Sequence, residues 1–173
     1  FFSDPGQIAQ AQATADDVVT ALVSGSLDRL TRSDPEAALV DIAAAIPVAS
    51  ADPRLLFDLV GLRAEAQAAL GDRAAQAISL RDLAALALRH RELLDVDPIS
   101  LLQEAAEIFE ELGEAETALG LSEAILEETR AAGLGEDRLA AALERVARLA
   151  EAAGNADRAS QAAEQAAALR ALA

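Results

Sequence analysis

Hydrophobic residues recur with helical spacing along most of the chain, and the clearest example is the stretch that follows Pro98. Its apolar positions lie three or four residues apart, at Leu101, Leu102, Ala105, Ile108, Phe109 and Leu112. Four glutamates stand between them: Glu104, Glu107, Glu110 and Glu111. This spacing predicts an amphipathic helix with one buried face and one acidic face.

Prolines and glycines mark where the helices start and stop. Four of the five prolines follow aspartate, in the pairs Asp4-Pro5, Asp34-Pro35, Asp52-Pro53 and Asp97-Pro98. Aspartate caps a free backbone N–H, and proline is tolerated in the first helical turn, so each pair predicts a helix start. Glycine commonly follows a helix end, and the periodicity stops at Gly25, Pro47, Gly71, Gly113, Gly133 with Gly135, and Gly154. The predicted helices cover residues 5–23, 35–46, 53–70, 72–94, 98–112, 114–132, 136–153 and 155–172.

Three of these glycines are regularly spaced. Gly71, Gly113 and Gly154 are separated by 42 and 41 residues, and the last two are each followed five residues later by an alanine. A fixed period of this size indicates a stack of helical repeats.

The residues around these glycines resemble the tetratricopeptide-repeat (TPR) family, in its variant with long helices. That family has large, large, small and aromatic positions along a first helix, then a turn glycine and a small residue in the second helix. Leu102, Ala105, Ala106 and Phe109 precede Gly113 and Ala118, and Leu143, Val146, Ala147 and Ala150 precede Gly154 and Ala159. The hairpin around Gly71 matches less fully, and the first hairpin does not match, which makes it a divergent cap.

The resemblance implies an all-α fold, a right-handed α-solenoid of about four hairpins within a single domain over residues 1–173. The hairpins cover roughly residues 5–46, 53–94, 98–132 and 136–172. A domain similar to a four-helix bundle is the alternative, because neither the period nor helix propensity excludes it.

The composition removes several classes of chemistry. The chain has no Lys, Cys, Met, Trp or Tyr, which excludes a Schiff-base lysine, a Walker-type phosphate loop and cysteine-ligated metals. Its formal net charge of −16 argues against nucleic acid and anionic membranes as partners. No apolar run of about 18 residues is present to insert into a membrane.

No residue pattern predicts a catalytic, cofactor or metal site. His90 is the single histidine, and Arg89 and Arg91 beside it supply neither a nucleophile nor an orienting carboxylate. Paired glutamates such as Glu110-Glu111 lack the aromatic platforms typical of sugar-binding clefts. Gly133-Leu134-Gly135 lacks the later glycine of a phosphate-binding loop. The chain is therefore predicted not to be an enzyme.

One charge pattern indicates a binding surface. No basic residue lies between Arg91 and Arg130, whereas twelve acidic residues do. The resemblance implies that the first helix of each repeat lines a concave groove used for ligands. Mapped from the two glycines, the partner-binding positions are Gln103, Glu104, Glu107, Glu110, Glu111, Glu144, Arg145 and Arg148. An acidic groove predicts a basic or N-terminal segment as its ligand, although acids on an exposed helix face also keep a protein soluble.

The predicted function is a protein–protein interaction module, a scaffold or adaptor that binds a protein or peptide through its concave face. The alternative is a helical accessory or regulatory domain of a larger bacterial enzyme, for example a hydrolase. A homo-oligomer is a further possibility, since the leucines between Leu80 and Leu94 predict a wide apolar surface. The lack of Lys is typical of a GC-rich bacterial gene, and a start at Phe1 leaves both a cytoplasmic location and a removed export signal open.

Overall fold

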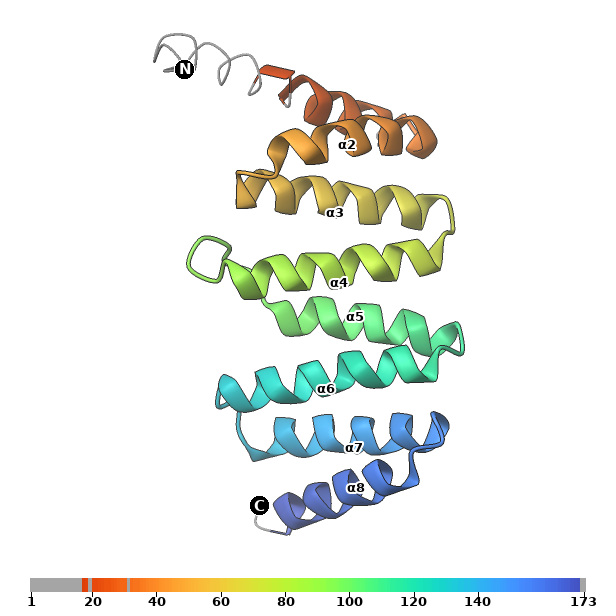
Figure 1. Cartoon of the computed structure of the whole chain (residues 1–173), viewed down its shortest axis with the longest axis vertical. Coiled ribbons are helices and arrows are strands. Elements are labelled where there is room, and N and C mark those ends of the chain that lie inside the picture. Colours follow the sequence, from red (N-terminus) through yellow and green to blue (C-terminus); the bar gives the residue numbers. More distant parts are fainter. Residues whose placement is uncertain (1–16, 19, 31, 172–173) are drawn as a thin grey trace, which may run out of the picture. The chain divides into compact units, whose positions relative to one another are not determined.

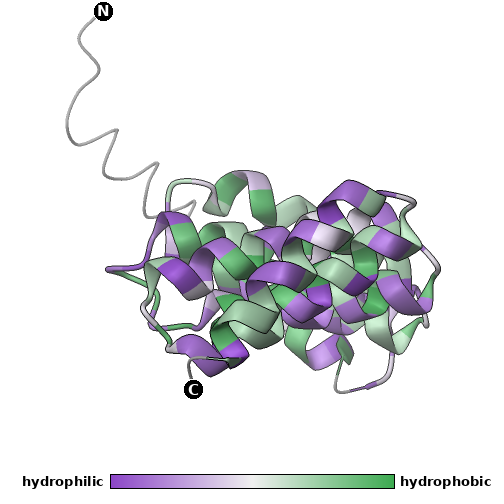
Figure 2. Cartoon of the chain, turned by 90° about the horizontal axis from the view of Figure 1, so that it is seen from below, coloured by the Kyte–Doolittle hydropathy of each residue, from purple (hydrophilic) through white to green (hydrophobic). Residues whose placement is uncertain are grey.

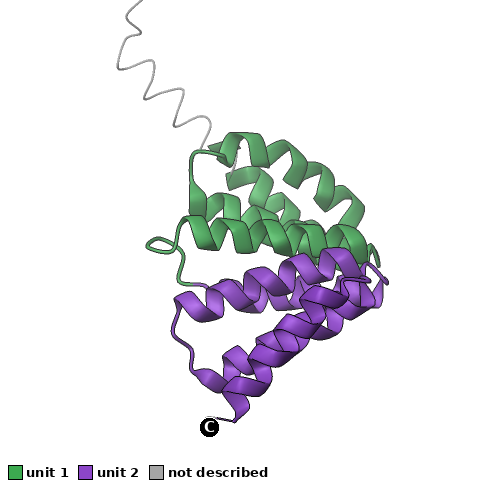
Figure 3. Cartoon of the chain, turned by 60° about the horizontal axis from the view of Figure 1, so that its bottom comes forward, with its two compact units in different colours: residues 1–95 green, residues 96–173 purple. Residues whose placement is uncertain are grey.

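All regular structure in the part of the chain that can be described is helical. The computed structural model describes residues 17–171 except 19 and 31, and within each part of the chain the successive helices pack as antiparallel neighbours (Figure 1). The chain divides into two compact units, residues 1–95 and residues 96–173 (Figure 3). The prediction of an all-α fold is confirmed, whereas the single-domain organisation stays a prediction.

The described part of the first unit contains a helical stretch over residues 20–30 followed by three longer helices. These are α2 (Pro35–Ala49), α3 (Pro53–Ala69) and α4 (Arg73–Arg89). Helix α3 packs against both α2 and α4. Between α2 and α3 the core is built from small and branched side chains, with Ala45, Ala49 and Leu59 in one cluster and Ala38, Ile42 and Leu62 in another.

The second unit consists of α5 (Pro98–Glu111), α6 (Ala115–Ala131), α7 (Glu136–Ala152) and α8 (Ala156–Arg170). Each helix packs against the next one in sequence, and the described residues show no contact between α5 and α8. A closed four-helix bundle would bring its first and last helices together. The bundle alternative is therefore wrong for this unit, which is a stack of two hairpins.

The helix starts have the capping that the Asp-Pro pairs predict. The Asp34, Asp52 and Asp97 side chains each accept a hydrogen bond from a backbone N–H in the first turn of α2, α3 and α5. The proline that follows each aspartate occupies a position where no backbone donor is needed. The pair Asp4-Pro5 and most of the predicted helix 5–23 lie outside the described residues.

The spaced glycines make the same turn three times. Gly71, Gly113 and Gly154 have φ angles of 73°, 78° and 77°, a left-handed conformation that residues with a side chain rarely adopt. In each turn the following residue donates its N–H to a carbonyl five residues back, as in the bond from Glu114 to Phe109 at 2.8 Å. This is the Schellman arrangement of a helix C-terminus. The period read from the sequence is thus a repeated backbone geometry.

Residues matched to the TPR pattern form much of the core of the second unit. Leu102, Ala105, Ala106 and Phe109 of α5 are buried, as are Leu143, Val146 and Ala150 of α7. Along the helices, hydrophilic and hydrophobic residues alternate (Figure 2). Each helix therefore buries one apolar face, as the periodicity predicts.

Three predicted helix boundaries are wrong. The helix over residues 20–30 continues through Gly25, where an added Cβ would lie 3.4 Å from a carboxylate oxygen of Asp41 in α2. Helix α2 continues two residues past Pro47, although proline removes one backbone hydrogen bond and its ring crowds the carbonyl four residues earlier. Helix α4 ends at Arg89 rather than near residue 94, since the His90 carbonyl accepts the N–H groups of Leu93 and Leu94 in a turn.

The leucines of α4 and of the turn after it do not form a wide exposed surface. Leu80, Leu83, Leu86 and Leu94 are buried, while Leu93 is half exposed. Most of the leucines that suggested self-association are therefore buried in the fold of the chain itself. A homo-oligomer stays a prediction, but these leucines no longer support it.

Candidate functional site

Helix α5 presents a row of polar side chains because its apolar residues are all turned to one side. Leu102, Ala105, Ile108 and Phe109 are buried, which leaves Gln103, Glu104, Glu107 and Glu111 exposed on the opposite side. Glu110 lies at the border and is only 21% exposed. The structure thus places the five α5 residues predicted to bind a partner at or near the surface.

Helix α7 brings two arginines to the same place. Its first turn follows Gly135, and its buried residues Leu143, Val146 and Leu149 fix which side of the helix faces the core. Arg148 is then largely exposed, while the Arg145 side chain is 19% exposed. Both arginines extend toward α5.

Glu110 joins the two helices. Its Oε1 accepts a hydrogen bond from Nη2 of Arg145 at 2.5 Å, and its Oε2 accepts one from Nη1 of Arg148 at 2.7 Å. A longer ion pair of 3.7 Å connects Arg145 to Glu107. We call Glu107, Glu110, Arg145 and Arg148, together with Gln103 one turn before Glu107 on α5, the α5–α7 face.

The charges of this cluster shift the titration of Glu110. Burial on its own would raise the pKa of the Glu110 carboxyl, because it disfavours the charged form. Hydrogen bonds from Arg148 and Arg145, together with their positive charges, outweigh that effect and hold the pKa below its ordinary value. Glu110 is therefore ionised at neutral pH, and the two arginines balance its negative charge.

A pocket of about 500 Å³ opens beside the α5–α7 face. Helix α6 contributes Ile125 and Thr129, and Leu134 of the following loop lies at its border. The other lining residues come from the start of α5 and from α7: Asp97, Ile99, Ser100, Gln103, Arg138, Ala141, Ala142 and Arg145. Polar and apolar residues line the pocket in about equal number, so the pocket offers contacts of both kinds.

In this pocket, which we call the α5–α7 pocket, two arginines have N–H groups without a hydrogen-bond acceptor among the described residues. Nε of Arg145 is buried and has no hydrogen-bond partner in the described part of the chain. Arg138 makes no ion pair or side-chain hydrogen bond to any described residue. The sequence prediction missed Arg138, although it lies seven residues before Arg145 and hence on the same side of α7.

The structure separates one predicted residue from the rest. Glu144 forms an ion pair with Nε of Arg170 in α8 at 3.2 Å, and Arg170 also binds Asp137 at 2.9 Å. Glu144 therefore contributes to the packing of α7 on α8, whereas the other predicted α7 residues, Arg145 and Arg148, meet α5.

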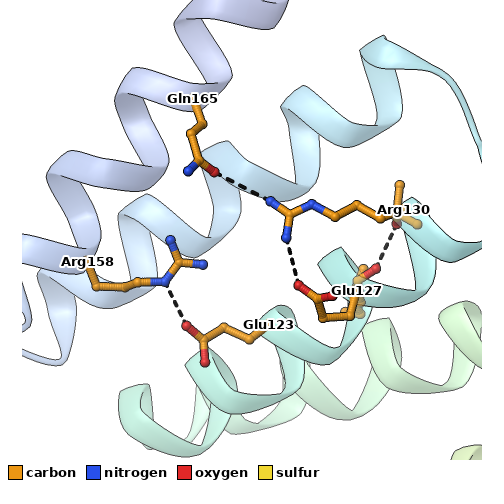
Figure 4. A network of polar contacts seen from close by, with 7 residues as sticks. Glu123, Glu127, Arg130, Arg158 and Gln165 are labelled. Carbon is orange, nitrogen blue, oxygen red and sulfur yellow. Dashed lines mark hydrogen bonds and ion pairs between the residues drawn. The ribbon is translucent and has the colours of Figure 1, made fainter.

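A second polar network links the other two helices of this unit (Figure 4). Nε of Arg158 in α8 donates to Glu123 of α6 at 2.8 Å, and Arg130 of α6 binds both Glu127 and, across to α8, Gln165. The cross-links Glu110–Arg145, Glu123–Arg158 and Arg130–Gln165 each span 35 residues. Charged side chains thus connect the first helices of the two hairpins, α5 and α7, and also the second helices, α6 and α8.

His90 has a structural position at the end of α4. Its backbone N–H binds the Leu86 carbonyl, and its own carbonyl closes the turn that follows. Among residues 17–171, apart from those too uncertain to place, no group of three His, Asp or Glu side chains could hold a metal ion. None of the helices in the same residues is long and apolar enough to cross a membrane.

No known family model and no curated protein matches the chain. Among solved structures, a chain described as a P. anserina kinesin light chain with nearly identical TPR-like repeats superposes with a TM-score of 0.52. It is 16% identical, and the alignment covers 96% of this chain and 88% of the other. The protein has a TPR-like helical-repeat fold.

Two further solved structures align less well. The MamA RS-1 ArsTM double mutant has a TM-score of 0.48 at 20% identity, with 88% of this chain and 75% of that chain covered. BtubC (BKLC) from P. vanneervenii has a TM-score of 0.45 at 17% identity, with 95% and 91% covered. The TPR-like assignment rests on the kinesin light chain repeats and on the recurring glycine turn. In a TPR-like repeat, α5 and α7 are the first helices of their hairpins.

Proposed function

We propose that this protein is a non-enzymatic interaction module, which binds a segment of a partner protein along the α5–α7 face. The observation that carries the proposal is the α5–α7 pocket, which lies between the first helices of consecutive hairpins. Its apolar walls suit a ligand side chain, and the polar groups around it suit a peptide backbone. The TPR-like fold supports this function because proteins with that fold serve as interaction scaffolds.

The acidic residues of α5 favour a basic or N-terminal segment as the ligand. Glu107 is 66% exposed, and its closest cation is 3.7 Å away, so its charge is still available to a partner. Glu104 is exposed and makes no ion pair with any described residue. Glu110, by contrast, is already neutralised by two arginines. Glu104 and Glu107 are therefore expected to form ion pairs with the basic groups of the ligand.

The test is a selection of random displayed peptides on the immobilised chain, followed by affinity measurements on the selected peptides. We expect enrichment of Lys and Arg, because opposite charge steers and orients the ligand. Glu107→Arg is expected to weaken the selected peptides roughly tenfold, since it replaces an attraction by a repulsion. Glu164→Arg is the matched control, because Glu164 is an exposed residue of α8 without an ion pair in the described structure. Equal affinities for wild type and Glu107→Arg would exclude the α5–α7 face as the binding site.

A further inference from the structure

The first unit contains a separate hollow, between the helical stretch over residues 20–30 and α3. Its volume is about 350 Å³. The lining residues, which we call the α3 groove, are Val23, Leu27, Phe57, Asp58, Gly61, Leu62 and Glu65. No residue of the α5–α7 pocket takes part in it.

The floor and walls of the α3 groove are apolar, and they are accessible. Leu27 is 47% exposed, and Phe57 is partly exposed beside it. At Gly61, an added Cβ would meet no atom within 4 Å, so the space above this turn of α3 is open. Glycine within a helix is less favourable than alanine, yet here it keeps the hollow free of a side chain. The groove is wide enough for a large apolar side chain of another molecule.

Two acids stand at the ends of the groove on the same side of α3. Asp58 and Glu65 are seven residues apart, which corresponds to about 10.5 Å along a helix. Both are exposed, and neither forms an ion pair with a described residue. Two other acids of this unit are neutralised, since Asp41 binds Arg29 at 2.6 Å and Asp82 binds Arg63 at 2.7 Å. Asp58 and Glu65 thus leave two negative charges on either side of an apolar hollow.

We propose that the α3 groove is a docking site for a protein segment with one large apolar side chain flanked on both sides by basic residues. The apolar side chain enters the hollow above Gly61, and the flanking cations pair with Asp58 and Glu65. Charge complementarity selects this occupant: an acidic flank would be repelled at both ends, and an uncharged flank would leave both carboxylates without a partner. The proposal concerns a second surface and does not depend on the α5–α7 face.

The probe is a fluorescein-labelled peptide with a central Phe, Arg residues on both sides and Ser elsewhere. Two companion peptides replace either the Arg residues by Glu or the Phe by Ser. Fluorescence anisotropy with the full chain is expected to show saturable binding of the first peptide only. Burial of one large apolar side chain is worth roughly a factor of ten or more in affinity, so the Ser peptide should bind at least that much more weakly.

Variants of the chain locate the site. Gly61→Leu is expected to reduce affinity roughly tenfold or more, because its side chain fills the hollow, while Gly61→Ala should retain most of the binding and add helix propensity. Asp58→Arg combined with Glu65→Arg should also abolish binding, and this pair lies on an exposed surface where folding is not at risk. Glu107→Arg on α5 should leave binding of this probe unchanged, which separates failure of this proposal from failure of the α5–α7 site.

Several outcomes would overturn the proposal. Equal binding of the Arg-flanked and Glu-flanked peptides would remove charge as the basis of recognition. Wild-type affinity in Gly61→Leu would place the peptide elsewhere. Light scattering that showed a dimer in wild type and a monomer in Gly61→Leu would identify a second copy of the chain as the occupant. Binding only after removal of residues 1–16, which include Phe1 and Phe2, would identify the chain's own N-terminal segment instead.

Discussion

At the scale of single residues, the acidic run between Arg91 and Arg130 is less uniform than its sequence indicates. Arg145 and Arg148 follow Glu110 by more than 30 residues in the sequence, yet both bind its carboxylate in the folded chain and neutralise it. Glu107 and Glu104 keep their charge exposed. The sequence therefore predicted which side chains lie on α5, whereas their ionic partners depended on how the next hairpin packs.

Glu110→Gln is expected to lower the free energy of unfolding by about 1–2 kcal/mol at neutral pH, because two arginines lose their shared anion. The folded pKa of Glu110 is lowered, so its stabilising contribution is complete above the unfolded value of about 4.3 and disappears as the pH falls through the folded pKa. Urea unfolding of both proteins between pH 7 and pH 3 measures this. The difference should shrink in the acid range. A difference that stays constant would show that the ion pairs are not its source. Glu104→Gln is the control and should have little effect at any pH.

The turn after Gly113 offers a stabilising substitution. Asp72 and Asn155 each cap the helix after their glycine through a side-chain oxygen, whereas Glu114, in a similar backbone conformation, makes no such bond. Glu114→Asp is expected to raise the free energy of unfolding by about 0.5–1 kcal/mol, because its shorter side chain can accept from the first turn of α6. Thermal unfolding followed by circular dichroism would detect the gain. The reciprocal change Asp72→Glu should destabilise the chain by a similar amount, and equal melting temperatures in all three proteins would refute the capping argument.

At the scale of helices, local signals predicted most boundaries but failed where tertiary contact decided them. The Asp-Pro pairs and the three spaced glycines act through their own backbone, so helices α3, α5, α6, α7 and α8 begin and end within one or two residues of the prediction. Gly25 was read as a stop, yet it lies inside a helix that approaches α2 closely. The sequence of the first helix alone does not predict that contact, because the contacting residue, Asp41, lies in α2.

The candidate site was predictable to the same extent. The resemblance to the TPR family, mapped from Gly113, singled out Gln103, Glu104, Glu107, Glu110 and Glu111, and all five lie on α5. The sequence did not separate Glu144 from Arg145, because neighbouring residues on a helix point in directions about 100° apart, and only the position of α8 shows that Glu144 pairs there. Arg138 and the pocket next to it required knowledge of how α5, α6 and α7 pack.

The hairpin that carries the α5–α7 face should depend on one aromatic residue. Phe109 is 7% exposed in α5, and Phe109→Ala is expected to cost about 3–5 kcal/mol through lost burial and the cavity left behind. Phe57→Ala is the matched control, because Phe57 is only partly buried at the edge of the α3 groove and should cost less. Urea unfolding of the two variants compares them. Equal costs would mean that Phe109 does not anchor α5 as its burial indicates.

At the scale of the whole molecule, charge and fold are the basis of the proposed interaction function. The net charge of −16 is the basis for proposing basic partners, and the range of such an attraction is set by ionic strength. The TPR-like fold supplies hairpins whose first helices, α5 and α7, expose polar side chains beside a pocket. The two proposed surfaces lie in different units, so each can be tested while the other is left intact.

The most direct test of the proposed function is an NMR titration of the full, isotope-labelled chain with a peptide obtained from the display selection. Binding at the α5–α7 face predicts chemical-shift changes concentrated between Asp97 and Glu111 and between Arg138 and Arg148, and their loss in Glu107→Arg. Changes concentrated on α6 and α8 near Glu123 and Arg158, or a shift pattern unaffected by Glu107→Arg, would contradict the account.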